Sequence, residues 1–461
     1  MVLALVACRA PSPELALLYN ESAQWHGPDR NPVIVIPGIL GTRLVDRDSG
    51  RLAWGAFDGT SADPARPDEA RVLALPVGDG GELSALRDGV VPDGVLERVK
   101  VRLLGIPVEL QAYAYILATL GAGGYRDESL GLGGEVDYGP GHFTCFQFAY
   151  DWRRDNVESA QQLAAFIAEK RAMVQREYAR RFGVENADVR FDIVAHSMGG
   201  LVTRYFLRYG ARDLPADGGL PELTWEGARS VDRVILVGTP NAGSAEALLE
   251  LVNGWQVAPL LPFYPAALVG TFPATYQLLP RTRHRAALWD GDPERPLPDL
   301  LDPALWERLG WGLAAAGADN VLASLLPEVR EPGQRRSRAR ALQRRALERA
   351  AAFQRALDRP AEPPTSLELF LVAGDAAATP STVAVDSASG AVRPITHGPG
   401  DGTVLRSSAL LDERVGQAFA PTLRSPIQFA SVLFLPESHL GLTSSPVFRD
   451  NVLFWLLEEP R

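Results

Sequence analysis

Short apolar runs alternate along the chain with longer stretches in which apolar residues recur at helical spacing. The runs predict buried strands in six places, at residues 31–44, 142–150, 189–195, 231–237, 366–373 and 429–435. Helical spacing predicts helices at residues 107–120, 155–182 and 446–458. The run 31–44 is rich in β-branched residues and stops at Pro37-Gly38, as expected of a parallel strand buried on both faces. This alternation predicts an α/β protein with a mostly parallel central sheet flanked by helices.

Two stretches interrupt the alternation. Residues 45–101 are polar and rich in Asp, Gly and Pro, which predicts an irregular, lid-like excursion. After Ser244 the alternation of strand and helix breaks for more than a hundred residues, which predicts an inserted cap. The predicted divisions are an N-terminal tether (1–30), a first core part with the excursion (31–243), the cap (244–365) and a second core part (366–461).

An arginine-rich segment, residues 334–359, lies in the predicted cap. Leu342, Ala346, Ala350 and Phe353 fall at helical spacing, and arginines occupy the opposite face. One hypothesis is a basic amphipathic helix lying on anionic lipid. The preferred interpretation is a cap helix whose arginine face is solvated.

Composition removes some classes of function. The net charge of −10 argues against nucleic acid as a partner, because phosphate binding needs a basic surface. Two cysteines in 461 residues exclude a disulfide framework, and Cys145 in FTCFQF is expected to be a buried thiol. No cluster of His, Cys and Asp has metal-ligand spacing, so neither a metal nor a cofactor is expected.

The first residues favour an envelope location. Leu5-Val6-Ala7-Cys8 resembles a bacterial lipobox, in which the cysteine becomes the lipidated first residue. The apolar stretch before it is short and carries no basic residue, unlike a complete signal. A lipoprotein of the bacterial cell envelope anchored through Cys8 is one hypothesis, a secreted protein is another, and a cytoplasmic location stays open.

The strongest chemical signal is the stretch 189–207, VRFDIVAHSMGGLVTRYFL. A buried strand leads into a serine flanked by small residues, and a helical pattern follows. This is the arrangement of a nucleophile elbow with Ser197 at its apex. Ala195 and Gly199, two residues to either side, are small enough for the strained turn that such a serine needs.

A serine hydroxyl needs an imidazole to take its proton and a carboxylate to orient that imidazole. His439 follows the last predicted strand, where a base should lie, whereas His397 falls in a predicted hairpin and is expected to be structural. Asp401 in GDGTV is the leading acid, because its flanking glycines make a tight loop that exposes the carboxylate. Asp375, directly after the strand 366–373, is the rival.

Backbone amides must also stabilise the oxyanion that forms during attack. One should be that of Met198, directly after Ser197, and the other that of Ile39 in the turn after the first strand. His196, beside the serine, is expected to point elsewhere.

The motifs VIVIPGILGTRL, AYDWRRD, VAHSMGGLVTRYFL, VGTPNAGS, TFPATYQLLP, GDGTV and SHLGL occur in this order. Together they resemble the lecithin:cholesterol acyltransferase family, which includes lysosomal phospholipase and phospholipid:diacylglycerol acyltransferases, and point to a bacterial member. The resemblance implies an α/β-hydrolase fold, the triad Ser197, Asp401 and His439, and an oxyanion hole at Ile39 and Met198. Residues 45–101 depart from the family because they contain no cysteines to close its lid.

These residues predict a serine acyl-ester hydrolase or acyltransferase that acts on phospholipid or other glycerolipid esters through an acyl-Ser197 intermediate. The expected partners are a lipid ester, an alcohol acceptor and a membrane surface. Two alternatives stay open: a carboxylesterase for small soluble esters, and a non-catalytic lipid-binding lipoprotein that keeps the fold.

Overall fold

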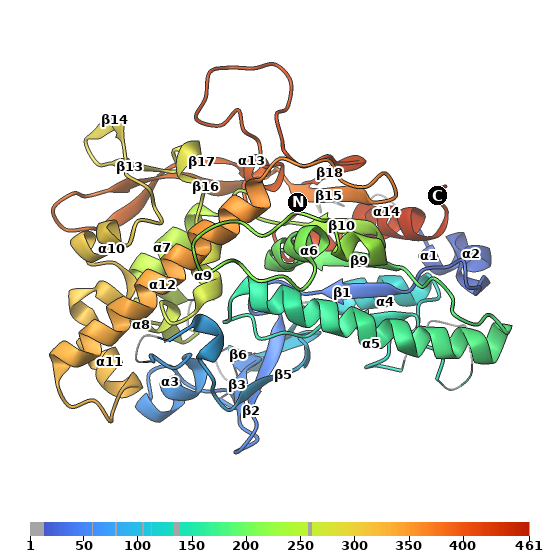
Figure 1. Cartoon of the computed structure of the whole chain (residues 1–461), viewed down its shortest axis with the longest axis horizontal. Coiled ribbons are helices and arrows are strands. Elements are labelled where there is room, and N and C mark those ends of the chain that lie inside the picture. Colours follow the sequence, from blue (N-terminus) through green and yellow to red (C-terminus); the bar gives the residue numbers. More distant parts are fainter. Residues whose placement is uncertain are drawn as a thin grey trace, which may run out of the picture.

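The computed structural model describes residues 13–57, 59–78, 81–103, 106–111, 113–131, 139, 141–256 and 261–460. Cys8 lies outside these residues, so its lipidation stays a prediction. A six-stranded sheet forms the centre of the molecule, and every neighbouring pair of its strands is parallel (Figure 1). In spatial order its strands are β18 (Ser431–Leu435), β15 (Glu368–Gly374), β10 (Val231–Val237), β9 (Phe191–His196), β1 (Val33–Ile36) and β8 (Cys145–Gln147).

The predicted parallel sheet is therefore confirmed. Every residue of β1 and β9 is buried, as their unbroken apolar runs require of strands that are covered on both faces. Their register places Val33 beside Asp192 and Ile36 beside Ala195, so both strands end at the same edge of the sheet. Ser197 follows β9 directly at that edge.

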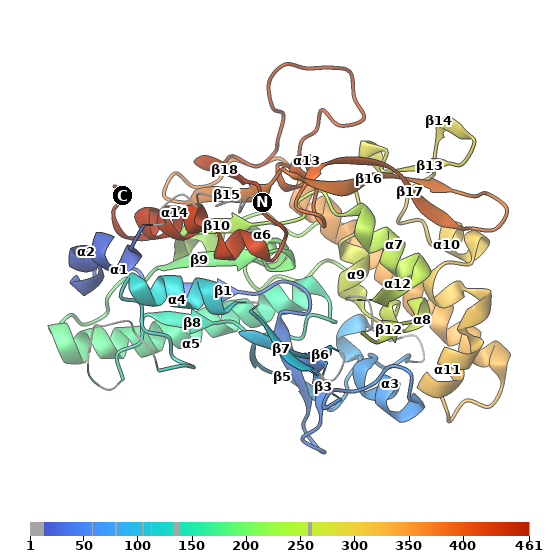
Figure 2. The same cartoon turned by 180° about the vertical axis from the view of Figure 1, so that it is seen from behind.

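Helices cover both faces of the sheet. Apolar residues of α5 (Asn156–Phe182) and α6 (Met198–Tyr209) share one core cluster with Ile34, Phe191 and Ile193. Helices α4 (Ala114–Ala122) and α14 (Pro446–Leu457) pack on the other face with Val33 and Val194, and they lie in front when the molecule is seen from behind (Figure 2). Alternate residues of one strand thus enter different cores, which is the period-2 pattern of a strand.

The prediction that residues 45–101 are irregular is wrong. Two three-stranded sheets begin within or beside this stretch, and a helix, α3 (Pro67–Leu73), lies between their strands. The first sheet contains β3 (Leu52–Trp54), β2 (Thr42–Asp46) and β5 (Val90–Val95), and the second contains β4 (Ala56–Phe57), β6 (Arg98–Leu103) and β7 (Ile106–Gln111). The predicted helix 107–120 is also wrong in its first half, because β7 pairs antiparallel with β6 and the helix begins only at Ala114.

The predicted cap region folds mainly as helices, with short β-strands between them. Its elements are α7 (Ala245–Asn253), β11 (Trp255–Gln256), β12 (Phe263–Tyr264), α8 (Ala266–Val269), α9 (Pro273–Gln277), β13 (Ala287–Trp289), β14 (Asp292–Pro296), α10 (Pro303–Leu309), α11 (Asp319–Leu325) and α12 (Pro332–Asp358). The predicted hairpin consists of β16 (Ala377–Val385) and β17 (Val392–Gly400). Strands β14 and β13 of the cap join it in a four-stranded sheet, in the order β14, β13, β16 and β17, which links cap and core. A short helix, α13 (Arg406–Ala409), follows β17.

The arginine-rich segment is helix α12, which crosses the front of the cap (Figure 1). Its apolar face is buried against the protein: Leu342, Ala346, Phe353 and Leu357 have essentially no exposed surface. That face is therefore not available to lie on lipid, and the preferred interpretation of a cap helix agrees with the packing. Arg336, on the opposite face, is exposed.

The described part of the predicted tether, residues 13–30, lies against the core. It forms α1 (Leu15–Leu18) and α2 (Asn20–Gln24), and Tyr19 between them donates a hydrogen bond of 2.8 Å to the Asp450 carboxylate in α14. No helix in the described ranges is both long enough and apolar enough to cross a membrane.

Candidate active site

Ser197 occupies the sharp turn between β9 and α6. Its backbone angles, φ 53° and ψ −127°, are strained for a residue with a side chain. The small neighbours make the turn possible: a Cβ on Gly199 would lie 2.4 Å from Pro37 O, and one on Gly200 would lie 2.0 Å from Thr239 Oγ1. The strand, turn and helix predicted around Ser197 are thus present.

The structure brings Ser197, His439 and Asp401 together from three distant parts of the chain. His439, in the loop after β18, places Nε2 2.9 Å from Ser197 Oγ and Nδ1 2.8 Å from Asp401 Oδ2. The other oxygen of Asp401 accepts hydrogen bonds from Thr403 N (2.9 Å) and Val404 N (2.7 Å). The glycine-flanked loop after β17 therefore holds one oxygen of the carboxylate, so that the other oxygen faces the imidazole of His439.

Asp375, the rival for the acid, and His397, the other histidine considered, make contacts elsewhere. Asp375 follows β15 and donates its backbone amide to Leu435 O. His397 lies opposite Pro380 in the β16–β17 hairpin and is exposed.

Electrostatics keep Asp401 ionised. Burial raises the pKa of its carboxyl group, but the neighbouring His439 and the hydrogen bonds from the Val404 and Thr403 amides outweigh burial, and the pKa is lowered overall. A charged Asp401 can accept a hydrogen bond from the Nδ1–H of His439 and so fix the ring with Nε2 facing Ser197.

The two predicted oxyanion donors belong to the turn after β1 and to the first residue of α6. Gly38 to Gly41 form a turn closed by a 3.1 Å hydrogen bond from Gly41 N to Gly38 O, with Leu40 at φ 65°. This turn lies against Ser197, since a Cβ on Gly38 would be 2.6 Å from Ser197 Cβ. Among the described residues, the structure assigns no hydrogen-bond acceptor to the amides of Ile39 and Met198.

Sequence reasoning missed a hydrogen-bond chain beside the serine. His196 Nε2 donates to the backbone oxygen of His439 (3.1 Å), because a carbonyl can only accept. His196 Nδ1 then accepts from the Tyr113 hydroxyl (3.0 Å), whose oxygen accepts from Gly38 N (2.8 Å). Burial, and next the charge of His439, lowers the pKa of His196 to about 3, so this ring is neutral. His196 points away from the serine, as expected, but it contacts the backbone of His439.

The YDWR block, Tyr150 to Arg153, holds the turn after β1 in place through hydrogen bonds. Tyr150 donates to Pro37 O (2.9 Å), and the indole of Trp152 donates to Thr42 O (3.2 Å). Arg153 is fully buried and pairs with Asp151 (2.7 Å) and with Asp88 (2.8 Å) from the excursion. The block therefore fixes the excursion to the first strand and its turn.

An aromatic cluster adjoins the same turn. Trp54 of β3 donates from Nε1 to Leu40 O (2.8 Å), and its ring lies 5.5 Å from that of Trp255 and 5.8 Å from that of Tyr264. Residues of the excursion and the cap thus form one apolar wall next to the residues predicted to hold an oxyanion. No group of three or more His, Cys, Asp or Glu side chains suited to a metal ion occurs in the described ranges.

The parallel sheet, with a serine at the strand–helix turn and an imidazole and a carboxylate on later loops, defines an α/β-hydrolase fold. Residues 136–292, which contain Ser197, match the model of the family described as lecithin:cholesterol acyltransferase. Over these residues, about a third of the chain, the match confirms the resemblance seen in the motifs.

Two solved structures resemble the chain along most of its length. A chain in the crystal structure of the Tle4–Tli4 complex is 16% identical, with a TM-score of 0.50 over 93% of this chain and 98% of that one. Lipase 1 from Pelosinus fermentans is 12% identical, with a TM-score of 0.35 over 94% of this chain and 100% of that one. The first of these likenesses supports the fold. A search of curated protein sequences finds no match.

Proposed function

We propose that this protein is a serine acyl-ester hydrolase or acyltransferase acting on lipid esters, most specifically phospholipids or other glycerolipids. The observation that carries the proposal is the continuous line of contacts from Asp401 through His439 to Ser197, with distances of 2.8 and 2.9 Å. The match to the lecithin:cholesterol acyltransferase family supports the ester class.

In the proposed reaction, His439 Nε2 takes the proton of Ser197 while Oγ attacks the ester carbonyl. Asp401 stabilises the imidazolium that forms, and the amides of Ile39 and Met198 stabilise the oxyanion. Collapse of the tetrahedral intermediate breaks the ester bond, and His439 returns the proton to the departing alcohol. Water or a second alcohol then attacks acyl-Ser197, with His439 again taking the proton. The bond between the acyl group and Ser197 Oγ breaks, and His439 returns the proton to Oγ.

The surroundings of the turn favour an apolar acyl group. The wall of Trp54, Trp255 and Tyr264 meets the turn at Leu40, so a substrate whose carbonyl is held by Ile39 would lie beside aromatic surface. A lipid substrate brings the protein to a membrane surface, and lipidation of Cys8 would serve the same end.

The test incubates the wild-type protein and the Ser197→Ala variant with phospholipid vesicles. Products are identified by mass spectrometry with and without a long-chain alcohol. Free fatty acid alone indicates water as the acceptor, and a new ester that depends on the alcohol indicates acyl transfer. Turnover should fall roughly 10³-fold or more in Ser197→Ala, with folding unchanged.

The control is Ser337→Ala on the exposed face of α12, which should keep full activity. A folded Ser197→Ala variant with wild-type turnover would refute the serine mechanism. If p-nitrophenyl acetate is cleaved but no vesicle product forms, the small-ester carboxylesterase replaces the lipid enzyme.

A further inference from the structure

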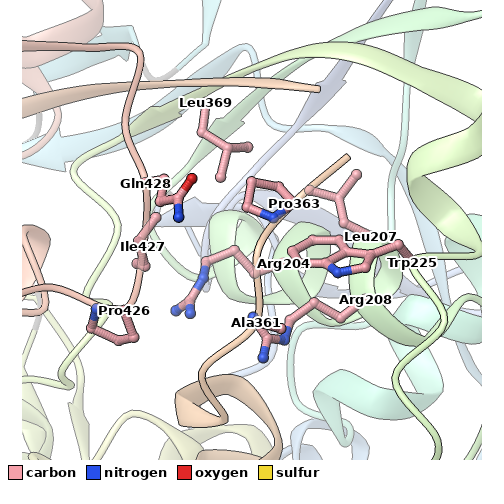
Figure 3. Close-up of a pocket in the computed structure, with 10 residues that line it drawn as sticks. All are labelled: Arg204, Leu207, Arg208, Trp225, Ala361, Pro363, Leu369, Pro426, Ile427 and Gln428. Carbon is pink, nitrogen blue, oxygen red and sulfur yellow. The ribbon is translucent and has the colours of Figure 1, made fainter. Parts of the chain in front are cut away.

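A second polar site lies at the far end of the helix that begins at Ser197. Arg204 and Arg208 occupy successive turns of α6, and each has only 4% of its surface exposed. Both side chains line a small pocket, in which Figure 3 shows them extending from the same helix toward the segment with Ala361 and Pro363. Buried guanidinium groups are rare in proteins unless they are paired.

The two guanidinium groups have few acceptors for their ten N–H donors. Arg204 donates to Asn241 Oδ1 (3.0 Å) and to Leu357 O (2.9 Å). Arg208 donates to Arg359 O and interacts with the hydroxyl of Tyr209. The Nε atom of Arg208 is buried and has no hydrogen-bond partner in the described structure.

None of these acceptors is a carboxylate. Within the described ranges neither arginine forms an ion pair, and the nearby Asp358 is taken by Arg281 and Arg283, each at 2.8 Å. Burial, and then the charge of Arg208, lowers the pKa of Arg204 to about 9, and the charge of Asp358, which is paired with Arg281 and Arg283, offsets only part of this. Burying a charge is costly unless it is paired.

Capping of a helix accounts for part of this arrangement. The oxygens of Leu357 and Arg359 lie at the C-terminus of α12, where Tyr209 also donates to Ala356 O (2.8 Å). A helix C-terminus carries about half of a negative elementary charge. Two guanidinium charges therefore exceed what α12 can balance.

We propose that Arg204 and Arg208 bind an oxyanion, a carboxylate or phosphate group, in this pocket. The planar forks of two arginines match such a group, and the unused Nε–H of Arg208 supplies a donor for it. The pocket opens to solvent, and Trp225, Leu369 and Ile427 give it an apolar wall. The guanidinium of Arg208 lies over the ring of Trp225, 5.3 Å from its centroid. The same oxyanion could be a free ion or the head of an amphiphile whose tail covers that wall.

The site is independent of the proposed reaction, so its test uses binding rather than turnover. Isothermal titration of the whole chain with inorganic phosphate, acetate and octanoate should give saturable binding of at least one of them. The melting temperature should rise by about 1–2 °C for each tenfold increase in anion above its Kd. Octanoate binding at least tenfold tighter than acetate would identify an amphiphile, and equal binding a small free oxyanion.

Three variants separate a site from a general salt effect. Arg208→Gln should weaken binding at least tenfold, and Arg208→Lys should also weaken it, because it keeps the charge but loses the fork. Arg340→Gln, an exposed arginine of α12, should bind as the wild type does. If Arg208→Gln fails to fold, the titration of the wild type still decides. The proposal is overturned by no saturable binding up to 20 mM of any of the three anions, or by equal affinity in folded Arg208→Gln.

Discussion

At the scale of single residues, the geometry around Ser197 depends on hydrogen bonds that leave little freedom to the groups beside it. The neutral ring of His196 uses both nitrogens, one toward Tyr113 and one toward the backbone of His439. Tyr113 in turn fixes the amide of Gly38, one residue before Ile39. This chain joins the proposed oxyanion turn to the backbone of the proposed base, so both should shift when it is broken.

Tyr113→Phe removes that link while keeping the aromatic ring in its buried place. We expect kcat to fall about tenfold with KM nearly unchanged, because the proposed oxyanion donors and base contact the transition state more closely than the ground state. The control is Tyr178→Phe, which loses a hydroxyl bonded to Arg30 O (3.2 Å) away from Ser197 and should keep kcat. Equal kcat values in the two variants and the wild type would show that the chain positions nothing.

The choice between the two aspartates gives a second prediction at this scale. Asp401→Ala should lower kcat/KM by roughly 10³-fold, since His439 loses the carboxylate at 2.8 Å that holds its tautomer. Asp375→Ala should leave kcat/KM within about threefold of the wild-type value. Esterase assays on both purified variants decide the matter, and the reverse ranking would make Asp375 the acid.

The candidate triad could be named from sequence because its members follow strands, where a parallel sheet presents its loops at one edge. Six histidines left few choices, and only His439 follows the last strand. Tyr113 could not be found in this way. It lies between β7 and α4, and its partners Gly38 and His196 are 75 and 83 residues away, so only the packed chain brings them together.

At the scale of elements, Asp155 connects the core with the cap. Its side chain caps α5 by accepting from Val157 N, accepts from Gln277 of α9, and pairs with Arg349 of α12 at 2.7 Å. Only 4% of the surface of Asp155 is exposed, so water could hardly replace its carboxylate as the partner of these groups. One carboxylate thus serves as a helix cap and as an ion-pair partner between two layers.

Asp155→Ala should therefore destabilise the protein by about 2–4 kcal/mol, because α5 loses its cap and Arg349 keeps only its exposed partner Asp213. Chemical denaturation measures this as a lower free energy of unfolding. Asp302→Ala provides the control, because exposed Asp302 only caps α10 through Ala304 N and should cost about 1 kcal/mol. Equal losses in the two variants would show that the Arg349 and Gln277 contacts add nothing.

The strands of the central sheet were predictable because both faces are buried and their apolar runs are unbroken. The two small sheets were not, because their strands are short and their pattern is interrupted. Strand β5 contains Pro92 and Gly94 and exposes its middle residues, so its sequence resembles a loop. Pairing with β2, more than forty residues earlier, makes it a strand. Such pairing is a property of the tertiary structure and leaves little trace in local spacing.

At the scale of the whole molecule, the N-terminal residues are tied to the core by polar groups. Arg30 donates to Ala23 O (3.2 Å) and Trp25 O (2.9 Å) and lies over the ring of Tyr125. His26 Nδ1 lies 2.8 Å from His142 Nε2, and His142 Nδ1 lies 3.3 Å from Glu177 of α5. The histidine pair therefore joins a segment before β1 to the strand region and the longest helix of that face.

This pair should make the stability of the fold sensitive to acid. Burial is the largest cause that lowers the pKa of His26 to about 3 and that of His142 to about 4, with Arg30 and Arg181 respectively adding to it. In the unfolded chain a histidine has a pKa of about 6.5, so between pH 6.5 and 4 the unfolded state binds more protons. The free energy of unfolding then falls as the pH falls, by about 1.4 kcal/mol per pH unit for each histidine.

His26→Gln removes one of the two histidines that bind a proton in the unfolded state but not in the folded state. Its unfolding free energy, measured by denaturant titration between pH 6.5 and 4.5, should fall less steeply than that of the wild type by about 1.4 kcal/mol per pH unit. Gln417→Ala, at an exposed position that carries no titratable group, should keep the wild-type slope. Acidic residues affect all three proteins alike, so the difference between slopes isolates the pair. A His26→Gln slope identical to that of the wild type would mean that His26 takes up its proton in the folded protein, and that the buried pair does not set the acid limit of the fold.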